Sequence, residues 1–283
     1  MIAILGGGLS GLMTGYMLQA YGATQDIIIL EKRHNLSFSN MSASFYCHEY
    51  LNDKLTPKEN KFLVRWIVNG NIKDPEKKYS MKVYDQIQDV SLKVTECEGY
   101  NLDILEMISK CSPSIRLSSD ITDINIYNKV IKIKDGDDIK YDKLISTIAM
   151  PIFMNISGEG RCTFDYRPIF TKTEYGFRTH NDNSITLEYF PDPAVHYYRK
   201  TYHNEKCEVV TESLEQAKGF YHKIFPGKIR INTEQQEHLN LFSIAMRKQG
   251  IYFFGRYAQW DPKVLITDVY ENITKNIGEI IYG

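Results

Sequence analysis

"MIAILGGGLSGLMTGYMLQAYGATQDIIILEK" occupies residues 1–32, and the order of its elements decides the fold class. Residues 2–5 form a short apolar run, which is typical of a buried parallel strand. Residues 6–11 match the pattern G-x-G-x-x-G. Apolar residues from position 9 to about 21 then recur at helical spacing, and "DIIIL" at 26–30 predicts a second strand. The stretch therefore predicts a strand, a glycine turn, a helix and another strand.

Each glycine of the G-x-G-x-x-G pattern meets a different steric requirement of a nucleotide site. Gly6 permits the tight turn, Gly8 lets the backbone approach a pyrophosphate, and Gly11 lets the helix pack closely on the strand. Leu9 and Ser10 open the helix, so its free N–H groups and the positive end of its dipole point at the phosphates. The alternative is a glycine turn that binds no ligand.

An acidic residue completes the pattern. Glu31 ends the second strand, 20 residues after Gly11. Its carboxylate can accept hydrogen bonds from a ribose 2′-hydroxyl and would repel a 2′-phosphate. Because turn, helix, strand and acid occur in the order of a Rossmann-type unit, the sequence predicts a dinucleotide site.

Length and composition limit the other interpretations. The 283 residues fit one large domain or two interleaved ones, and the net charge is −1. A near-neutral chain has no field to hold a long polyanion, so broad nucleic-acid binding is not predicted. Five cysteines at irregular spacing predict reduced thiols of a cytoplasmic protein. No run of about 18 apolar residues is present, so we expect no membrane span.

Two segments resemble the glutathione-reductase-like flavoproteins, and this resemblance selects FAD as the cofactor. The first is the opening strand with "LEKR" at 30–33, which implies that Lys32 also lies at the cofactor. The second is "IKYDKLISTIAMP" at 139–151, with Thr147 at its turn, although an ordinary core strand would look the same. In these flavoproteins the strand equivalent to "SDITDI" passes the adenine, which implies Ile121 as a contact. No second complete glycine fingerprint is present.

A second glycine turn stands near the C-terminus, in "YFFGRYAQW" at 252–260. Gly255 and Arg256 end a predicted strand at a helix entry, where backbone N–H groups and a guanidinium come together. Such a site would stabilise an anionic isoalloxazine or the FAD pyrophosphate. The alternative is a strand end with a surface arginine.

The remaining elements predict a β-rich chain. We expect a helix over 55–70 with Thr56 as its cap, a partly alternating stretch over 77–94, and a helix over 101–111 capped by Asn101. Residues 115–147 predict a three-stranded meander with turns at 127–128 and 135–136, and residues 152–212 predict an antiparallel sheet. A helix over 213–225 capped by Ser213 follows, and strand 251–254 leads into a C-terminal helix.

The expected fold class is α/β: a discontinuous Rossmann-type FAD-binding domain with an inserted antiparallel-sheet substrate domain. We assign residues 1–35, 101–150 and 245–283 to the FAD-binding domain. Residues 36–100 form an insertion that covers part of the flavin, and residues 151–244 form the substrate domain.

Patches of the chain resemble the UDP-galactopyranose mutase and amine-oxidase branch of flavoproteins. They are the opening unit, "YFPDPAVHYYRKTYH" at 189–203 and "GRYAQW" at 255–260. With "YSMKVYDQIQDVSL" at 79–92, they more closely resemble short FAD-dependent oxidoreductases of bacteriophages. Some of those phage enzymes accompany thymidine hypermodification, where they are assigned oxidation of an amino-acid adduct on the base. The chain departs from the mutases at 33–50, where "RHNLSFSNMSASFYCHEY" replaces their Gly-Gly and flavin-face histidine loop.

The resemblance also implies substrate contacts. Arg199 matches a position where the mutases present an arginine to substrate phosphate, although a solvated sheet arginine is the alternative. Strand alternation would place Tyr198 and Lys200 on one face, and Tyr197, Arg199 and Thr201 on the other. The phage resemblance implies Tyr79, Lys82 and Tyr84 as substrate contacts. Tyr198, beside Arg199, is a further candidate for substrate binding.

His48 is the candidate for proton transfer, because the covering segment should bring it near the flavin. A structural or exposed histidine is the alternative. The other histidines have no metal-ligand spacing, so no metal site is expected.

Together these features favour an FAD-dependent oxidoreductase of amine-oxidase type, acting on a small molecule or a modified nucleotide. DNA enters as a partner only by analogy, and the location would be the cytoplasm, that of the host if the protein is viral. One alternative is a sugar-nucleotide mutase that uses reduced flavin. The other is a non-catalytic binder on a flavoprotein fold, as in the GDP-dissociation inhibitors.

Overall fold

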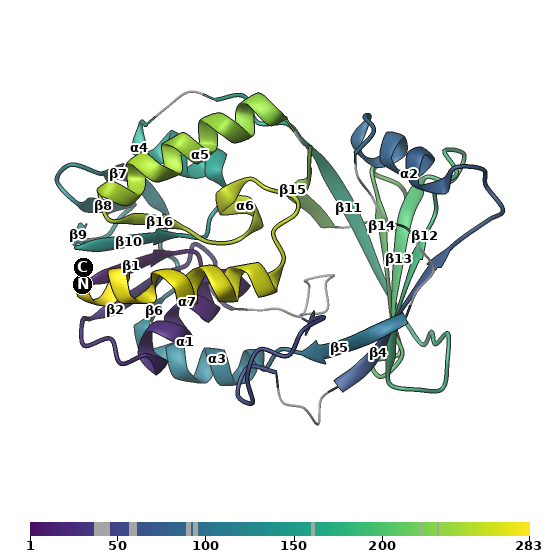
Figure 1. The fold of residues 1–283 in the computed structure, drawn as a ribbon, viewed down its shortest axis with the longest axis horizontal. Helices are drawn as coiled ribbons and strands as arrows, with labels where there is room; N and C mark the ends of the chain where they lie inside the picture. The colour runs from purple at the N-terminus through teal and green to yellow at the C-terminus, as the bar shows by residue number, and fades with distance from the viewer. Residues whose placement is uncertain are drawn as a thin grey trace.

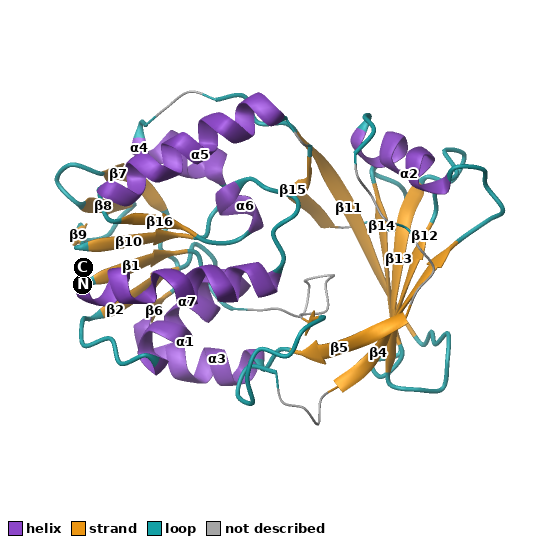
Figure 2. Cartoon of the chain, in the orientation of Figure 1, coloured by secondary structure: helices purple, strands orange, loops and turns teal. Residues whose placement is uncertain are grey.

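A computed structural model describes residues 1–36, 46–56, 61–88, 92, 96–159, 162–220, 222–230 and 232–283. Two bodies lie side by side (Figure 1). One is a parallel sheet covered by helices on both faces, and the other is a large mixed sheet that faces the first body. Strands and the loops between them cross from one body to the other several times (Figure 2).

The parallel sheet contains the N-terminal strand at its centre. Its order is β16 (Ile251–Phe253), β10 (Lys143–Ser146), β1 (Ile2–Leu5), β2 (Ile27–Leu30) and β6 (Ile115–Arg116). All neighbouring pairs run parallel. The β1 side chains are fully buried and alternate between the two faces, with Ile4 on one core and Leu5 on the other. A continuous apolar run therefore forms a strand that is buried on both sides.

Helices complete the two cores of this body. One face carries α1 (Leu9–Ala20), α3 (Ile104–Cys111) and α7 (Ile266–Tyr282), with the short 3-10 turn η2 (Ser112–Ser114) after α3. The other face carries α4 (Met150–Ser157), α5 (Thr233–Lys248) and the residues around α6 (Arg256–Gln259). The same face packs against an antiparallel three-stranded sheet of β7 (Ile121–Asn125), β8 (Val130–Ile133) and β9 (Ile139–Lys140).

The second body is an eight-stranded sheet. Its order is β15 (His222–Ile229), β11 (Tyr166–Tyr175), β14 (Glu208–Ser213), β13 (Tyr197–His203), β12 (Ser184–Tyr189), β4 (Lys61–Val68), β5 (Glu96–Asn101) and β3 (Tyr46–Cys47). Only the β12–β4 pair is parallel among these neighbours. Helix α2 (Pro75–Tyr84) packs beside β13 and β15.

The expected fold class is confirmed, as are the glycine turn between β1 and α1 and the meander β7–β8–β9 with its turns at 127–128 and 135–136. The domain division stays a prediction. Two segments nevertheless lie elsewhere than expected: β4 and β5 join the same sheet as β11–β15, and α4 and α5 pack on the parallel sheet.

Several local predictions are wrong. Residues 61–68 form strand β4 rather than a helix, because Phe62 and Val64 alternate into a core and the strand pairs on both sides. The stretch predicted to alternate contains helix α2, which starts at Pro75. Ser213 ends strand β14 and does not cap a helix. Residues 57–60, the first turn predicted after Thr56, lie outside the described residues.

Candidate functional site

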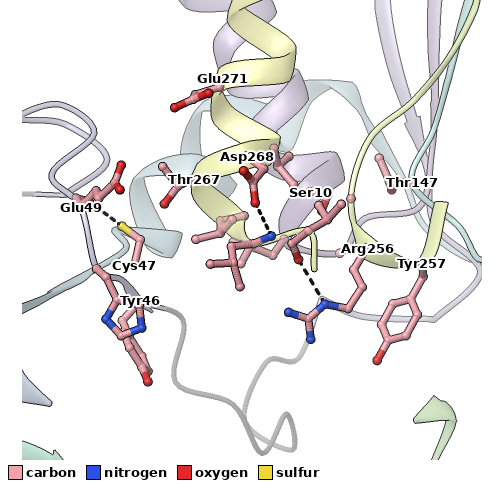
Figure 3. Close-up of a pocket in the computed structure, with 18 of the residues that line it drawn as sticks. Ser10, Tyr46, Cys47, Glu49, Thr147, Arg256, Tyr257, Thr267, Asp268 and Glu271 are labelled. Atoms are coloured by element: carbon pink, nitrogen blue, oxygen red, sulfur yellow. Dashed lines mark hydrogen bonds between the residues drawn. The ribbon is translucent and has the colours of Figure 1, made fainter. Parts of the chain in front are cut away.

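A cavity of about 740 Å³ lies between the two bodies. Its lining joins segments that are far apart in the sequence: the glycine turn and α1, strand β3, the inner face of the large sheet, the turn before α6, and the start of α7. In Figure 3, Tyr46, Cys47 and Glu49 stand on one side, and Arg256 and Tyr257 on the other. Predicted residues that line it are Gly6, Gly8, Leu9, Ser10, His48, Thr147, Arg199, Gly255 and Arg256.

The floor of the cavity is the glycine turn. A Cβ added to Gly11 would lie 1.9 Å from the carbonyl oxygen of Gly6, so only glycine fits there. A Cβ added to Gly8 would meet no protein atom within 4 Å. Thr147 Oγ1 donates a hydrogen bond of 2.7 Å to the carbonyl oxygen of Leu5, which ties β10 to the turn. The space at Gly8, beside the uncapped start of α1, fits a pyrophosphate.

Glu31 lies buried at the end of β2, behind this turn. Its Oε2 accepts a hydrogen bond of 2.7 Å from the backbone N–H of Gly7. Its Oε1 accepts one of 2.9 Å from the backbone N–H of Arg33. Burial raises the pKa of Glu31, but hydrogen bonds from Arg33 and Gly7 outweigh this and hold it below its usual value. The carboxylate is therefore ionised. The Arg33 guanidinium also donates to both of its oxygens, from Nε to Oε1 at 2.9 Å and from Nη2 to Oε2 at 3.2 Å. Glu31 is not among the residues that line the cavity, so its ribose contact stays a prediction.

Lys32 and Ile121 do not line the cavity. Lys32 is exposed and pairs with Asp120, with Nζ 2.9 Å from Oδ1. Ile121 lies on β7 and packs against the core under the parallel sheet. Their cofactor contacts stay predictions.

The second glycine turn lies against the first. A Cβ on Gly255 would come within 2.5 Å of Ser10 Oγ, so the two turns are in close contact. The backbone of Gly255 has φ +100°, which favours glycine. Arg256 Nε donates to the carbonyl oxygen of Val264 at 3.1 Å, which turns the guanidinium toward the start of α7 (Figure 3). The guanidinium of Arg256 and the N-terminal end of α7 therefore lie at the same wall of the cavity.

A β-bulge on β13 shapes the opposite wall. The register against β14 shifts between Tyr197 and Arg199. Strict alternation is therefore wrong here: Lys200 Nζ lies 4.8 Å from the centre of the Tyr197 ring, so these two share a face. Tyr198 is fully buried, with its ring centre 6.2 Å from that of Tyr79. Arg199 and Thr201 both line the cavity.

Arg199 is paired with Glu212 of β14. Its Nη2 donates 2.9 Å to Glu212 Oε1, while Nε lies 2.5 Å from Oε2 without hydrogen-bond geometry. Glu212 is only 4% exposed. Burial raises the pKa of Glu212, but the charges of Arg199 and Lys228 outweigh this and hold it below its usual value. The pair is thus a buried ion pair at the cavity wall.

Lys228 of β15 completes this charged group. Its Nζ lies 5.2 Å from the centre of the Tyr198 ring. Burial and the guanidiniums of Arg199 and Arg256 lower the pKa of Lys228 to about 7, against the opposing effect of Glu212. The amine therefore gains or loses its proton near neutral pH.

His48 lines the cavity, and its ring already contacts two other side chains, Cys97 and Trp66. Its Nδ1 is 3.2 Å from Cys97 Sγ, and its ring lies 5.4 Å from that of Trp66. Burial lowers the pKa of His48, against a backbone hydrogen bond to Glu98 and the charge of Glu49. The imidazole is neutral at physiological pH, and its predicted catalytic role stays a prediction.

Tyr79, Lys82 and Tyr198 lie behind the cavity wall. The rings of Tyr79 and Tyr198 are buried with centres 6.2 Å apart. Lys82 Nζ donates to the carbonyl oxygens of Phe190, Asp192 and Tyr197 at 2.7–2.8 Å, which joins α2 to the turn between β12 and β13. This geometry gives Lys82 a structural task, and direct substrate contact by the three residues stays a prediction.

Sequence reasoning missed Glu212, Lys228, Trp66 and Tyr189. Trp66 and Tyr189 line the cavity from β4 and β12. The signal for the two charged residues was a Glu and a Lys inside otherwise β-forming stretches, "VVTES" and "FPGKI".

The fold is similar to those of several solved structures. A reduced UDP-galactopyranose mutase matches with a TM-score of 0.70, at 13% identity over 99% of this chain and 93% of that one. A protein of Exiguobacterium sp. 255-15, assigned as a protoporphyrinogen oxidase, matches at 0.63, with 10% identity over 99% and 98%. A fatty acid isomerase of P. acnes matches at 0.53, with 11% identity over 100% and 98%.

No protein-family profile and no curated protein sequence matches this chain. The likeness therefore rests on fold, and the fold is that of these enzymes over nearly their whole length. Within the described ranges, none of the helices has the length and apolar character needed to cross a membrane.

Proposed function

We propose that this chain is an FAD-dependent oxidoreductase. The observation that carries the proposal is the open space at Gly8, on the floor of a cavity that the large sheet covers. Gly6, Gly8 and Ser10 would hold the pyrophosphate, Glu31 the ribose, and Arg256 with the start of α7 the flavin. Bound FAD would supply a two-electron acceptor.

The rest of the cavity suits a substrate with a planar or apolar part. Trp66, Tyr189 and Leu187 line it from the large sheet, and Tyr257 faces them from α6. Their side chains would exclude water from the reacting carbon, while Arg199 would bind an anionic group. We favour amine oxidation, with an amino-acid or amine adduct on a modified nucleotide or DNA base as the substrate. The support for that substrate is the resemblance of residues 79–92 to the phage enzymes.

A bacteriophage source, a link to DNA modification and a cytoplasmic location belong to the same proposal. Non-catalytic binding is disfavoured because the glycine turn and Glu31 keep the arrangement that a dinucleotide requires.

Anaerobic mixing with candidate substrates tests the reaction class. Amines and amino-acid-bearing nucleotides should bleach the visible flavin absorption, and under air the same compounds should release peroxide if oxygen is the acceptor. Turnover of UDP-galactopyranose after dithionite reduction, with no flavin bleaching by any amine, would instead establish a mutase.

A further inference from the structure

The imidazole of His48, at the cavity wall, contacts the thiol of Cys97 on β5. His48 Nδ1 lies 3.2 Å from Cys97 Sγ, and the same Sγ lies 3.2 Å from the carbonyl oxygen of Glu98. The rings of Tyr46 and Trp66 pack against the imidazole, with their centres 5.2 Å and 5.4 Å from its own. Packing therefore holds the ring, and one of its nitrogens is turned to the thiol.

Both groups in this contact are neutral at physiological pH. Burial lowers the pKa of His48, against a hydrogen bond to the Glu98 carbonyl, so the ring carries a hydrogen on only one nitrogen. Burial, with the charge of Glu98 as a lesser cause, raises the pKa of Cys97, so the thiol keeps its single hydrogen. Two hydrogens are thus available for the two contacts of Sγ.

The carbonyl oxygen decides where these hydrogens lie. A carbonyl can only accept, so its contact with Sγ uses the thiol hydrogen of Cys97. The contact between Sγ and His48 then needs a hydrogen on Nδ1, because the thiol has no second one. If the thiol donated to Nδ1 instead, the contact with the carbonyl would contain no hydrogen. The arrangement that satisfies both contacts is Nδ1–H···Sγ–H···O=C, and it leaves Nε2 without a hydrogen.

We propose that Cys97 is a positioning residue that holds His48 in the Nδ1–H tautomer, so that Nε2 serves as a hydrogen-bond acceptor in the cavity. His48 lines the cavity, whereas Cys97 is not among the lining residues, so Cys97 acts through the imidazole. Among the described residues, no side chain or backbone N–H donates to Nε2. This nitrogen is therefore open to a ligand.

The tautomer selects the kind of ligand group that fits His48. A group that contacts an unprotonated Nε2 has to donate a hydrogen, as an ammonium or a hydroxyl does. A carboxylate only accepts at neutral pH, so it is disfavoured at this position. The amine of the proposed substrate therefore binds at His48. This second part of the proposal rests on the proposed function, whereas the tautomer does not.

NMR correlation of the histidine ring nitrogens with their carbon-bound hydrogens shows which nitrogen is protonated. The full-length chain is measured at mildly alkaline pH, and the signals lost in His48→Gln identify His48. Wild type should show mainly the Nδ1–H form. Cys97→Ala should lower the ratio of Nδ1–H to Nε2–H by roughly 2- to 13-fold, the factor that one ordinary hydrogen bond supplies.

Two further variants separate this role from a general effect of losing a thiol. Cys97→Ser should keep the wild-type ratio, because a hydroxyl also donates to the carbonyl and accepts from Nδ1. Cys162→Ala removes another partly buried free thiol and should leave His48 unchanged. A wild-type spectrum with the hydrogen on Nε2 overturns the proposal, and so does a ratio that Cys97→Ala does not change. If Cys97→Ala does not fold, the wild-type spectrum and Cys97→Ser decide the question.

Benzylamine and benzoate test the ligand class. They are added without oxygen to dithionite-reduced protein, so that the amine is not consumed. Benzylamine should move the Nε2 signal toward its protonated position, and benzoate should not. A response to benzoate, or none to benzylamine, contradicts the amine assignment. The tautomer is measured with or without flavin, so a colourless protein leaves that test intact, and a wrong tautomer leaves the FAD assignment intact.

Discussion

At Gly8, a side chain would meet the ligand but not the protein. Because no protein atom lies within 4 Å of an added Cβ, Gly8→Val should fold normally, with valine occupying the pyrophosphate space. Adding bulk to a filled site costs about 1–3 kcal/mol, so we expect FAD affinity to fall by roughly 5- to 150-fold. Flavin absorption per chain and the circular-dichroism melt measure the two effects.

Gly278→Ala is the matched control. Gly278 lies in α7, and its added Cβ also meets nothing within 4 Å. That variant should keep both its fold and its flavin. If Gly8→Val retained its full flavin content, the pyrophosphate could not bind at this turn, and the site assignment would be wrong.

His203 should make the protein sensitive to acid. Burial, with the charge of Lys206 as a lesser cause, lowers the pKa of His203 to about 4. Because the unfolded chain takes up the proton first, stability is present above pH 6.5 and is lost as pH falls toward 4. Between pH 7.5 and 5 the loss should be about 2 kcal/mol, since one pKa unit corresponds to about 1.4 kcal/mol.

Urea unfolding of wild type and His203→Gln at these two pH values measures the effect. The variant should lose less stability on acidification than wild type by that amount. Equal losses in both proteins would show that His203 is not the titrating group.

Among the elements, α3 gives a direct comparison of sequence and structure. Asn101 was the predicted cap, but Asp103 is the residue before the helix, and its side chain accepts 2.9 Å from the backbone N–H of Glu106. Asp103→Ala should therefore cost about 1 kcal/mol of stability. Denaturant midpoints of Asp103→Ala and Asn101→Ala test this, and a larger loss in the Asn101 variant would favour the sequence-based cap.

Elements were predicted well where their signal is local. The turn at Gly6 and Gly11 follows from sterics within a few residues, and the meander β7–β8–β9 follows from its turn residues. Strand β4 was mistaken for a helix because its pairing partners, β12 and β5, lie far away in the sequence. Long-range pairing overrides local propensity at such positions.

Across the whole molecule, the turns that line one wall of the cavity could be predicted, and the charged group at the opposite wall could not. Gly8, Thr147 and Arg256 each lie in a turn that can be recognised from the local sequence, and all three line one cavity. Glu212 pairs with Arg199, and Lys228 lies over the Tyr198 ring, only because strands β13, β14, β11 and β15 are neighbours and a bulge shifts the register between Tyr197 and Arg199. Neither the strand order nor the bulge leaves a signal in a single sequence.

The central claim is that the cavity between the two bodies holds FAD. Its most direct test is the visible absorption of the purified full-length chain, followed by calorimetric titration with FAD if flavin is lost during purification. We expect a yellow protein, or one that takes up FAD in stoichiometric amount. A colourless chain that gives no heat with added FAD would contradict the account.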